Sequence, residues 1–161
     1  MTDTIAALGV LNDLDVKARS EALDAFYARF KDDPLVVEKW LSLQAMSRLP
    51  NTLDTVRALL KHPAFSMKNP NKVRSLLGAF AGGNQQRFHA ASGEGYDFIA
   101  EQTILLDKIN PHGSARLLPP LGRWRRYDPA RQEKMKAALK RVLDTPGLSS
   151  DAYEIATKSL G

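Results

Sequence analysis

The sequence predicts an all-α fold, a superhelical, solenoid-like stack of antiparallel helix pairs. Apolar residues recur at spacings of three and four, the period of an α-helix, and no long stretch alternates with the two-residue period of a strand. An aspartate or asparagine followed by proline, which joins an N-cap to the first helical position, occurs at residues 33, 69, 110 and 128. The chain has 161 residues, and we expect residues 1–161 to form a single helical domain.

Three helices are predicted in the first part of the chain. Residues 16–30 carry an apolar stripe that is typical of an amphipathic helix. Asp33 and Pro34 begin a helix over residues 35–46, which we expect to be central because its apolar face is wide. That face contains Leu35, Val36, Trp40, Leu43 and Met46. Asn51 is expected to cap the next helix, with core positions at Leu53, Val56, Leu59 and Leu60.

The middle of the chain contains similar residues that begin and end helices. A helix begins at Asn69-Pro70, and we expect Gly82-Gly83 to end it in a left-handed conformation. Gly93 precedes a long helix that reaches residue 109. A shorter helix follows Asn110-Pro111 and is expected to break at Pro119-Pro120.

The last part contains a short basic turn or helix over residues 121–127 and two longer helices. Asp128-Pro129 begins a helix over 130–143, and Ser149 or Ser150 caps the final helix. In total we expect about eight or nine helices of roughly 8–18 residues, joined by short loops that favour antiparallel neighbours.

Composition excludes several classes of protein and site. Hydrophobic residues make up 43% and charged residues 25%, as in an ordinary globular protein. The chain has no cysteine, which excludes disulfides and a thiolate zinc site and fits a reducing compartment. No apolar run approaches the roughly 20 residues of a membrane span, and the N-terminus lacks a signal-peptide layout. We therefore expect a cytoplasmic protein without membrane contact.

The sequence contains none of the catalytic motifs that we sought. His62, His89 and His112 are too far apart to hold a metal from one helix face, and no HExxH is present. The chain also lacks a GxSxG nucleophile elbow and a phosphate-binding glycine loop. We expect His62 and His89 to be capping, loop or core residues. The sequence alone predicts neither catalysis nor a cofactor in this chain.

Positive charge is concentrated between residues 111 and 141, where nine lysines and arginines face only Asp128 and Glu133. Within this region, arginines at 123, 125 and 126 interleave with Trp124 and Tyr127, and such residues can stack on bases and neutralise phosphates. The commoner arrangement has the aromatic rings packed inward and the arginines in water. Both interpretations stay open from the sequence.

A second candidate site contains Arg74, His112 and Arg116. His112 and Arg116 are four residues apart, so they share one face of a helical turn that follows Pro111. Arginine and histidine near a helix start are suited to binding an anion. The alternative is that these are ordinary exposed polar residues.

Nine short blocks of the sequence are distinctive. They are DDPLVVEKW at 32–40, NPNKVRSL at 69–76, GAFAG at 78–82, FHA at 88–90, GY at 95–96, NP at 110–111, ARL at 115–117, RYD at 126–128 and RQEKM at 131–135. In content and order these blocks resemble the bacterial aminopeptidase N family of zinc metallopeptidases, and the resemblance covers almost the whole chain.

This resemblance implies that the chain is the C-terminal helical domain of such an enzyme, walling in the active site without supplying its catalytic residues. The family's zinc, its HExxH-plus-glutamate ligands and its GAMEN-type motif lie in a catalytic domain upstream, which would be the partner of this domain. The enzymes of this family remove N-terminal residues from peptides. By motif position, Arg74, His112 and Arg116 would contact the peptide substrate, and His112 stands where glutamine is expected.

Two further readings belong to other classes of protein. One is a freestanding helical-repeat binding module whose basic face contacts nucleic acid or an acidic protein. The other is a helical enzyme with an unrecognised site. For the accessory-domain reading, we also expect the isolated chain to self-associate, because the face that normally docks on the catalytic domain would be uncovered.

Overall fold

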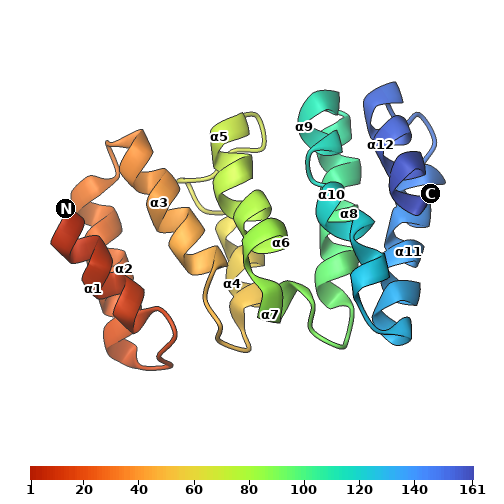
Figure 1. Cartoon of the computed structure of the whole chain (residues 1–161). Coiled ribbons are helices and arrows are strands. Elements are labelled where there is room, and N and C mark those ends of the chain that lie inside the picture. The colour runs from red at the N-terminus through yellow and green to blue at the C-terminus, as the bar shows by residue number, and fades with distance from the viewer. The chain divides into compact units, whose positions relative to one another are not determined.

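A computed structural model describes residues 1–161, and all of its secondary structure is helical, as predicted (Figure 1). The α-helices are α1 (Thr2–Leu11), α2 (Lys17–Phe30), α3 (Pro34–Ala45), α4 (Thr52–Leu59), α5 (Pro70–Val73), α6 (Ala79–Gly83), α7 (Gln85–Phe88), α8 (Glu94–Asp107), α9 (Pro111–Ala115), α10 (Pro119–Gly122), α11 (Pro129–Leu143) and α12 (Ser150–Leu160). A π-helix, Arg74–Gly78, joins α5 to α6, and Trp124–Arg126 is a 3₁₀ helix. By their contacts, the residues form two compact units, Met1–Arg87 and Phe88–Gly161.

Predicted side-chain caps begin five of these helices. The side chain of Asp33 accepts hydrogen bonds from the backbone N–H groups of Leu35 and Val36, at 3.1 and 3.4 Å. Asn69, Asn110, Asp128 and Ser149 cap their helices in the same way. Local chemistry therefore fixes where five helices start.

Four local expectations are wrong. Asn51 precedes α4 but its side chain makes no cap hydrogen bond. Gly82 and Gly83 do not adopt a left-handed conformation, and α6 ends at Asn84 instead. Pro119 begins the short helix α10 rather than breaking one, because proline suits a first helical position. On α3, Leu35 and Met46 are exposed by 69% and 41%, so its buried face is narrower than expected.

The helix count also differs from the expectation in detail. α1 and α7 were not predicted, because their apolar residues form no clear stripe. Conversely, the one helix predicted after Asn69 is a continuous run over residues 70–83 that changes from α to π and back. In the π segment, the backbone carbonyl of Ser75 accepts a hydrogen bond from the Ser42 hydroxyl of α3, at 2.8 Å.

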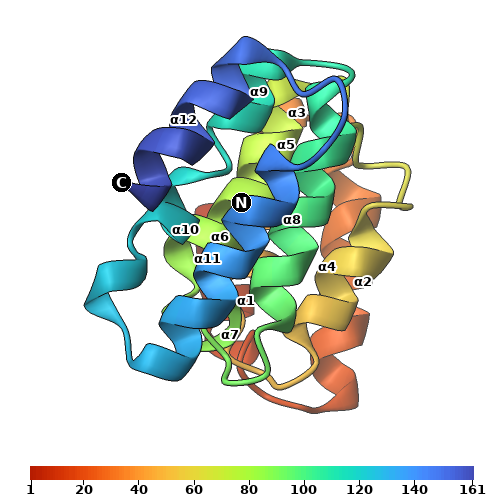
Figure 2. The same cartoon turned by 90° about the vertical axis from the view of Figure 1, so that its right-hand side faces the viewer.

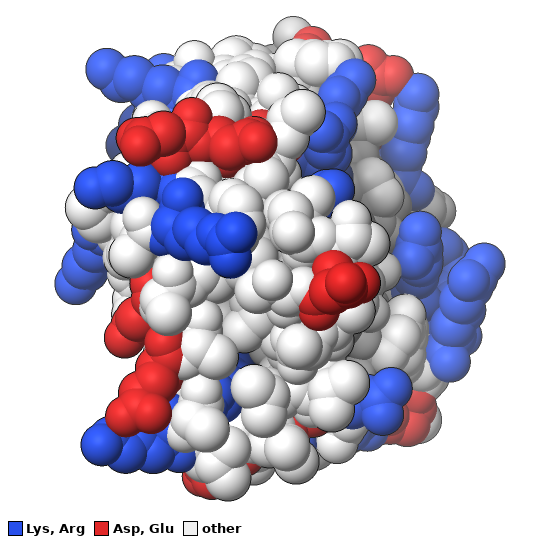
Figure 3. Space-filling model, turned by 90° about the vertical axis from the view of Figure 1, so that its left-hand side faces the viewer, with Lys and Arg blue, Asp and Glu red and all other residues white.

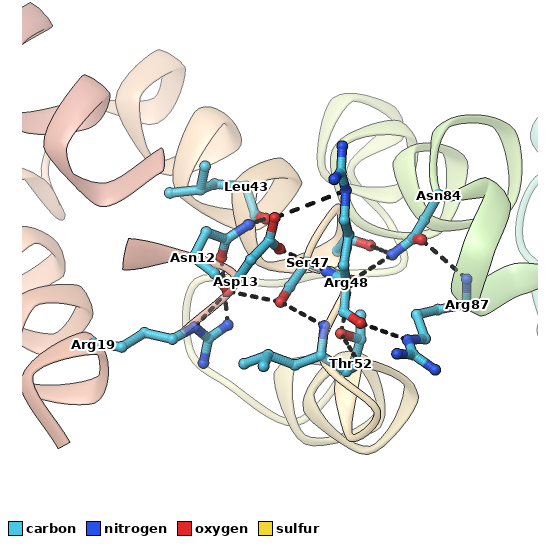
Figure 4. A network of polar contacts seen from close by, with 11 residues as sticks. Asn12, Asp13, Arg19, Leu43, Ser47, Arg48, Thr52, Asn84 and Arg87 are labelled. Atoms are coloured by element: carbon cyan, nitrogen blue, oxygen red, sulfur yellow. Dashed lines mark hydrogen bonds and ion pairs between the residues drawn. The ribbon is translucent and has the colours of Figure 1, made fainter. Parts of the chain in front are cut away.

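Buried polar side chains connect the helix ends of the first unit (Figure 4). Asn12 follows α1 and donates to the carbonyl of Leu43 at 2.6 Å. Asn84 follows α6 and donates to the carbonyls of Ala45 and Ser47, at 2.9 and 2.7 Å. The Ala45 carbonyl lies in the last turn of α3, where carbonyls lack a helical donor, and the Asn84 amide supplies one. The Leu43 carbonyl also accepts from the Met46 N–H, and the Ser47 carbonyl, just after α3, also accepts from the Thr52 hydroxyl.

In the second unit, α11 lies between α8 and α12 (Figure 2). His89 packs in the core of this unit. Its Nδ1 is 2.8 Å from the Tyr96 hydroxyl, and its ring stacks on Tyr127. Arg131 of α11 donates to the backbone carbonyl of His89 at 2.8 Å. His89 is therefore a core residue, as expected. Burial, followed by the charges of Arg131 and Arg123, lowers the pKa of His89 to about 4.

We expect Asn84→Ala to reduce the free energy of unfolding by about 1–3 kcal/mol, because it leaves the buried Ala45 carbonyl without a donor and removes one of two side-chain donors to the Ser47 carbonyl. Urea denaturation of the 161-residue chain would measure the loss. Asn51→Ala is the matched control, since the Asn51 side chain is exposed and makes no cap bond; it should cost less than about 0.5 kcal/mol. Equal losses for the two variants would contradict the structural role of Asn84.

The depressed pKa of His89 predicts a stability that falls on acidification. The unfolded state binds this proton near pH 6.5 and the folded state only near pH 4, so stability is full above pH 6.5 and declines between these values. The free energy of unfolding, measured by heat or urea, should be about 1–2 kcal/mol lower at pH 5 than at pH 7.5 because of this residue. His89→Gln should remove that part of the difference; a variant with an unchanged pH dependence would overturn the assignment.

Candidate functional site

A charged groove lies between α9 and α12 of the second unit. Its volume is about 270 Å³, and its walls are formed by His112, Ala115, Arg116, Pro119, Asp151, Glu154 and Ile155. Two of the three predicted site residues, His112 and Arg116, therefore line one groove. The sequence did not single out Asp151 and Glu154, because they lie far along the chain and belong to no motif.

Local structure places the two basic residues. The Asn110 side chain accepts a hydrogen bond from the Gly113 N–H at 2.9 Å, and Pro111 occupies the first helical position. This start puts His112 in the only full turn of α9 and Arg116 directly after it, four residues on and so on the same face. Both side chains are exposed.

The charges in the groove are only partly paired. His112 Nδ1 lies 3.9 Å from Asp151 Oδ2, and both side chains are more than half exposed. Glu154 forms an ion pair with Lys158, one helical turn away, at 2.5 Å. Arg116 has no ion-pair partner in the chain. The groove thus offers one unopposed guanidinium and one carboxylate, that of Asp151, whose nearest basic group lies beyond hydrogen-bond distance.

Arg74, the third predicted residue, belongs to the first unit. It begins the π-helix, is exposed, and donates to the Asn71 side chain at 3.2 Å. Its aliphatic stem packs against Gly78, where an added Cβ would lie 3.5 Å from Arg74 Cγ. Arg74 is therefore a second exposed guanidinium without a carboxylate partner, held by a π segment of the kind that recurs at functional sites.

A family model described as "Domain of unknown function (DUF3458_C) ARM repeats" matches residues 1–161. The chain belongs to this ARM-repeat family. It is 45% identical to aminopeptidase N of Escherichia coli strain K12 over 160 residues, 99% of this chain and 18% of that protein. It is 41% identical to aminopeptidase N of Caulobacter vibrioides over 161 residues, 100% of this chain and 19% of that protein.

A solved structure shares the fold. The crystal structure of Legionella pneumophila aminopeptidase A in complex with aspartic acid is 38% identical and has a TM-score of 0.94, covering 99% of this chain and 19% of that one. The resemblance inferred from the sequence is confirmed, and the chain corresponds to the C-terminal part of aminopeptidase N relatives. It spans about a fifth of their length.

In this ARM-repeat domain, Asp107 at the end of α8 positions both walls of the groove. Its buried carboxylate accepts hydrogen bonds from the Ser114 hydroxyl of α9 at 2.6 Å and from the Ser149 N–H and hydroxyl before α12 at 2.8 and 2.5 Å. Burial would raise the pKa of Asp107, but the bonds from Ser114 and Ser149 outweigh it and hold that pKa below its usual value.

The basic stretch of the domain adopts the arrangement in which the tryptophan packs inward. The half-buried Trp124 donates from Nε1 to the Ser159 carbonyl at 2.9 Å, and Arg125 and Lys136 cover its ring at 4.1 and 5.1 Å. Arg123, Arg125 and Arg126 face water. Because the Trp124 ring is already covered by cations, it does not offer a free stacking surface for bases. The hypothesis that this region binds nucleic acid therefore gains no support here.

The chain contains no group of three or more histidine, aspartate or glutamate side chains arranged to hold a metal. His62 is a capping and packing residue as expected: its Nδ1 accepts from the Ala64 N–H at 3.0 Å, and its ring packs against Tyr27 and Trp40. No helix combines the length and apolar character that crossing a membrane requires.

Asp107→Asn should reduce the free energy of unfolding by about 2–3 kcal/mol at neutral pH, since it removes charge-assisted hydrogen bonds that join α8, α9 and α12. Because the folded pKa is depressed, the carboxylate's contribution is present above the unfolded value of 3.8 and disappears as pH falls below it. The gap between wild type and variant should thus shrink in urea titrations toward about pH 3. Asp97→Asn, an exposed position on the same helix, is the control and should be near neutral.

Proposed function

We propose that this chain is the non-catalytic C-terminal domain of a zinc-dependent aminopeptidase that releases N-terminal residues from peptides. Its identity to aminopeptidase N relatives over the whole chain is the observation that carries this proposal. The catalytic zinc and the residues that activate water would lie in the other four fifths of the enzyme. The domain would close the active-site chamber and exclude folded proteins from it.

Within that setting, we assign Arg116, His112 and Arg74 to substrate contact. A peptide held by its free amine at the catalytic centre presents its C-terminal carboxylate to the far wall of the chamber. Arginine binds a carboxylate through two parallel charge-assisted hydrogen bonds, and Arg116 is exposed with no internal carboxylate to satisfy it. Such contacts orient the peptide and leave proton transfer at the scissile bond to other groups.

The first unit exposes apolar side chains of the kind that another part of a larger protein often covers. On the side formed by α1 and α2, charged side chains lie around a largely uncharged centre (Figure 3). Val10 and Leu35 are exposed by 75% and 69%. We propose that the rest of the enzyme covers apolar surface of this kind, so that the isolated chain self-associates. The proposal also treats residues 1–161 as one functional domain of a cytoplasmic enzyme.

Arg116→Ala tests this function in the full-length enzyme with zinc. We expect the enzyme to cleave both peptides and single-residue chromogenic amides. The variant should raise KM for peptides by about threefold to tenfold and leave the amides nearly unchanged, because they have no C-terminal carboxylate to lose a contact. Arg126→Ala, which removes an exposed arginine outside the groove, should change neither KM. Equal effects of Arg116→Ala on peptides and amides would remove the assigned role.

A further inference from the structure

We propose that Asp151 makes the groove selective for peptides whose C-terminal residue is lysine or arginine. The inference rests on the proposed function and goes beyond it, because it names the side chain that accompanies the bound carboxylate. It follows from three properties of the groove between α9 and α12: its free charges, its apolar floor and its size.

The free charges match the two charges of a basic C-terminal residue. Arg116 has no partner in the chain and is available to the carboxylate. The nearest basic group to Asp151 is His112, whose Nδ1 lies 3.9 Å from Asp151 Oδ2, longer than a hydrogen bond. The carboxylate of Asp151 therefore has room to accept a hydrogen bond from a basic side chain in the groove. The carboxylate of Glu154 is occupied by Lys158.

The apolar residues that line the groove suit the methylene stem of a lysine or arginine side chain. Ala115, Pro119 and Ile155 line the groove between its charged residues. The methylene stem of a long basic side chain gains by packing on apolar atoms while its charged end stays in water. The exposed Asp151 offers that charged end a partner at the rim of the groove.

The size fits a single residue. A volume of about 270 Å³ lies just below the range for small-molecule pockets, about 300–1,000 Å³. It suits one side chain with its carboxylate rather than a partner helix. A C-terminal glutamate would place a second negative charge beside Asp151 and Glu154, so its binding is expected to be weaker.

The test measures KM of the full-length enzyme at about pH 8 for Ala-Ala-Lys, Ala-Ala-Gln and Ala-Ala-Glu. For wild type, KM for the lysine peptide should be about threefold to tenfold lower than KM for the glutamate peptide, with the glutamine peptide between them. Asp151→Asn should bring this ratio close to one. Asp151→Lys should reverse it, which provides a gain of preference that a merely damaged groove would not show. Asp144→Asn, an exposed aspartate outside the groove, should keep the wild-type ratio.

The outcomes separate this inference from the proposed function. If Arg116→Ala distinguishes peptides from amides but Asp151→Asn leaves the lysine-to-glutamate ratio unchanged, the selectivity of Asp151 is overturned and the function stands. If Arg116→Ala shows no such distinction, the groove does not contact the substrate and both fail. Chromogenic amides should respond to neither Asp151 variant.

Discussion

The structure depends on how the buried ends of its helices find hydrogen-bond partners. The last carbonyls of a helix lack an internal donor, and in packed helices water cannot always reach them. In the first unit, Asn12 and Asn84 donate to carbonyls at the end of α3. Ser47, in the same turn, donates to the Asn12 carbonyl at 2.7 Å, and no buried side-chain nitrogen or oxygen of the chain is left without a partner. Short polar side chains therefore determine which helix ends meet.

In the second unit, charged side chains supply hydrogen-bond partners for the buried ends of helices and loops. Asp107 collects donors from two other segments, while Arg131 and Lys134 of α11 donate to the carbonyls of His89 and Ala91 in the loop before α8. Gly93 in this loop has φ +77°, and an added Cβ would lie 2.8 Å from Lys134 Cδ. The loop thus requires glycine for both its conformation and its contact with α11. Because Asp107 is buried and Arg131 only partly exposed, these bonds fix α8, α9, α11 and α12 as one frame.

The sequence predicts those parts of the fold that local chemistry decides. Asp33, Asn69, Asn110 and Asp128 cap helices within three residues of themselves, so spacing alone identifies them. Asn84 and Asp107 each also bind partners about 40 residues away, Ala45 and Ser149, and nothing near them in the sequence indicates those contacts. The groove divides in the same way. His112 and Arg116 share a turn and a family motif, whereas Asp151 reaches the groove only because Ser149, two residues earlier, is bound to Asp107.

This division separates the residues that hold the groove from those that face it. Asp107, Ser114 and Asn110 hold the backbone of α9 and the start of α12, whereas His112, Arg116 and Asp151 project from that backbone into water. An exposed side chain with few contacts can change at little cost in folding free energy. The residue at position 112 can therefore change without disturbing the frame beneath it. The side chains that line the groove can vary by single substitutions while the fold stays constant, because the two depend on different atoms.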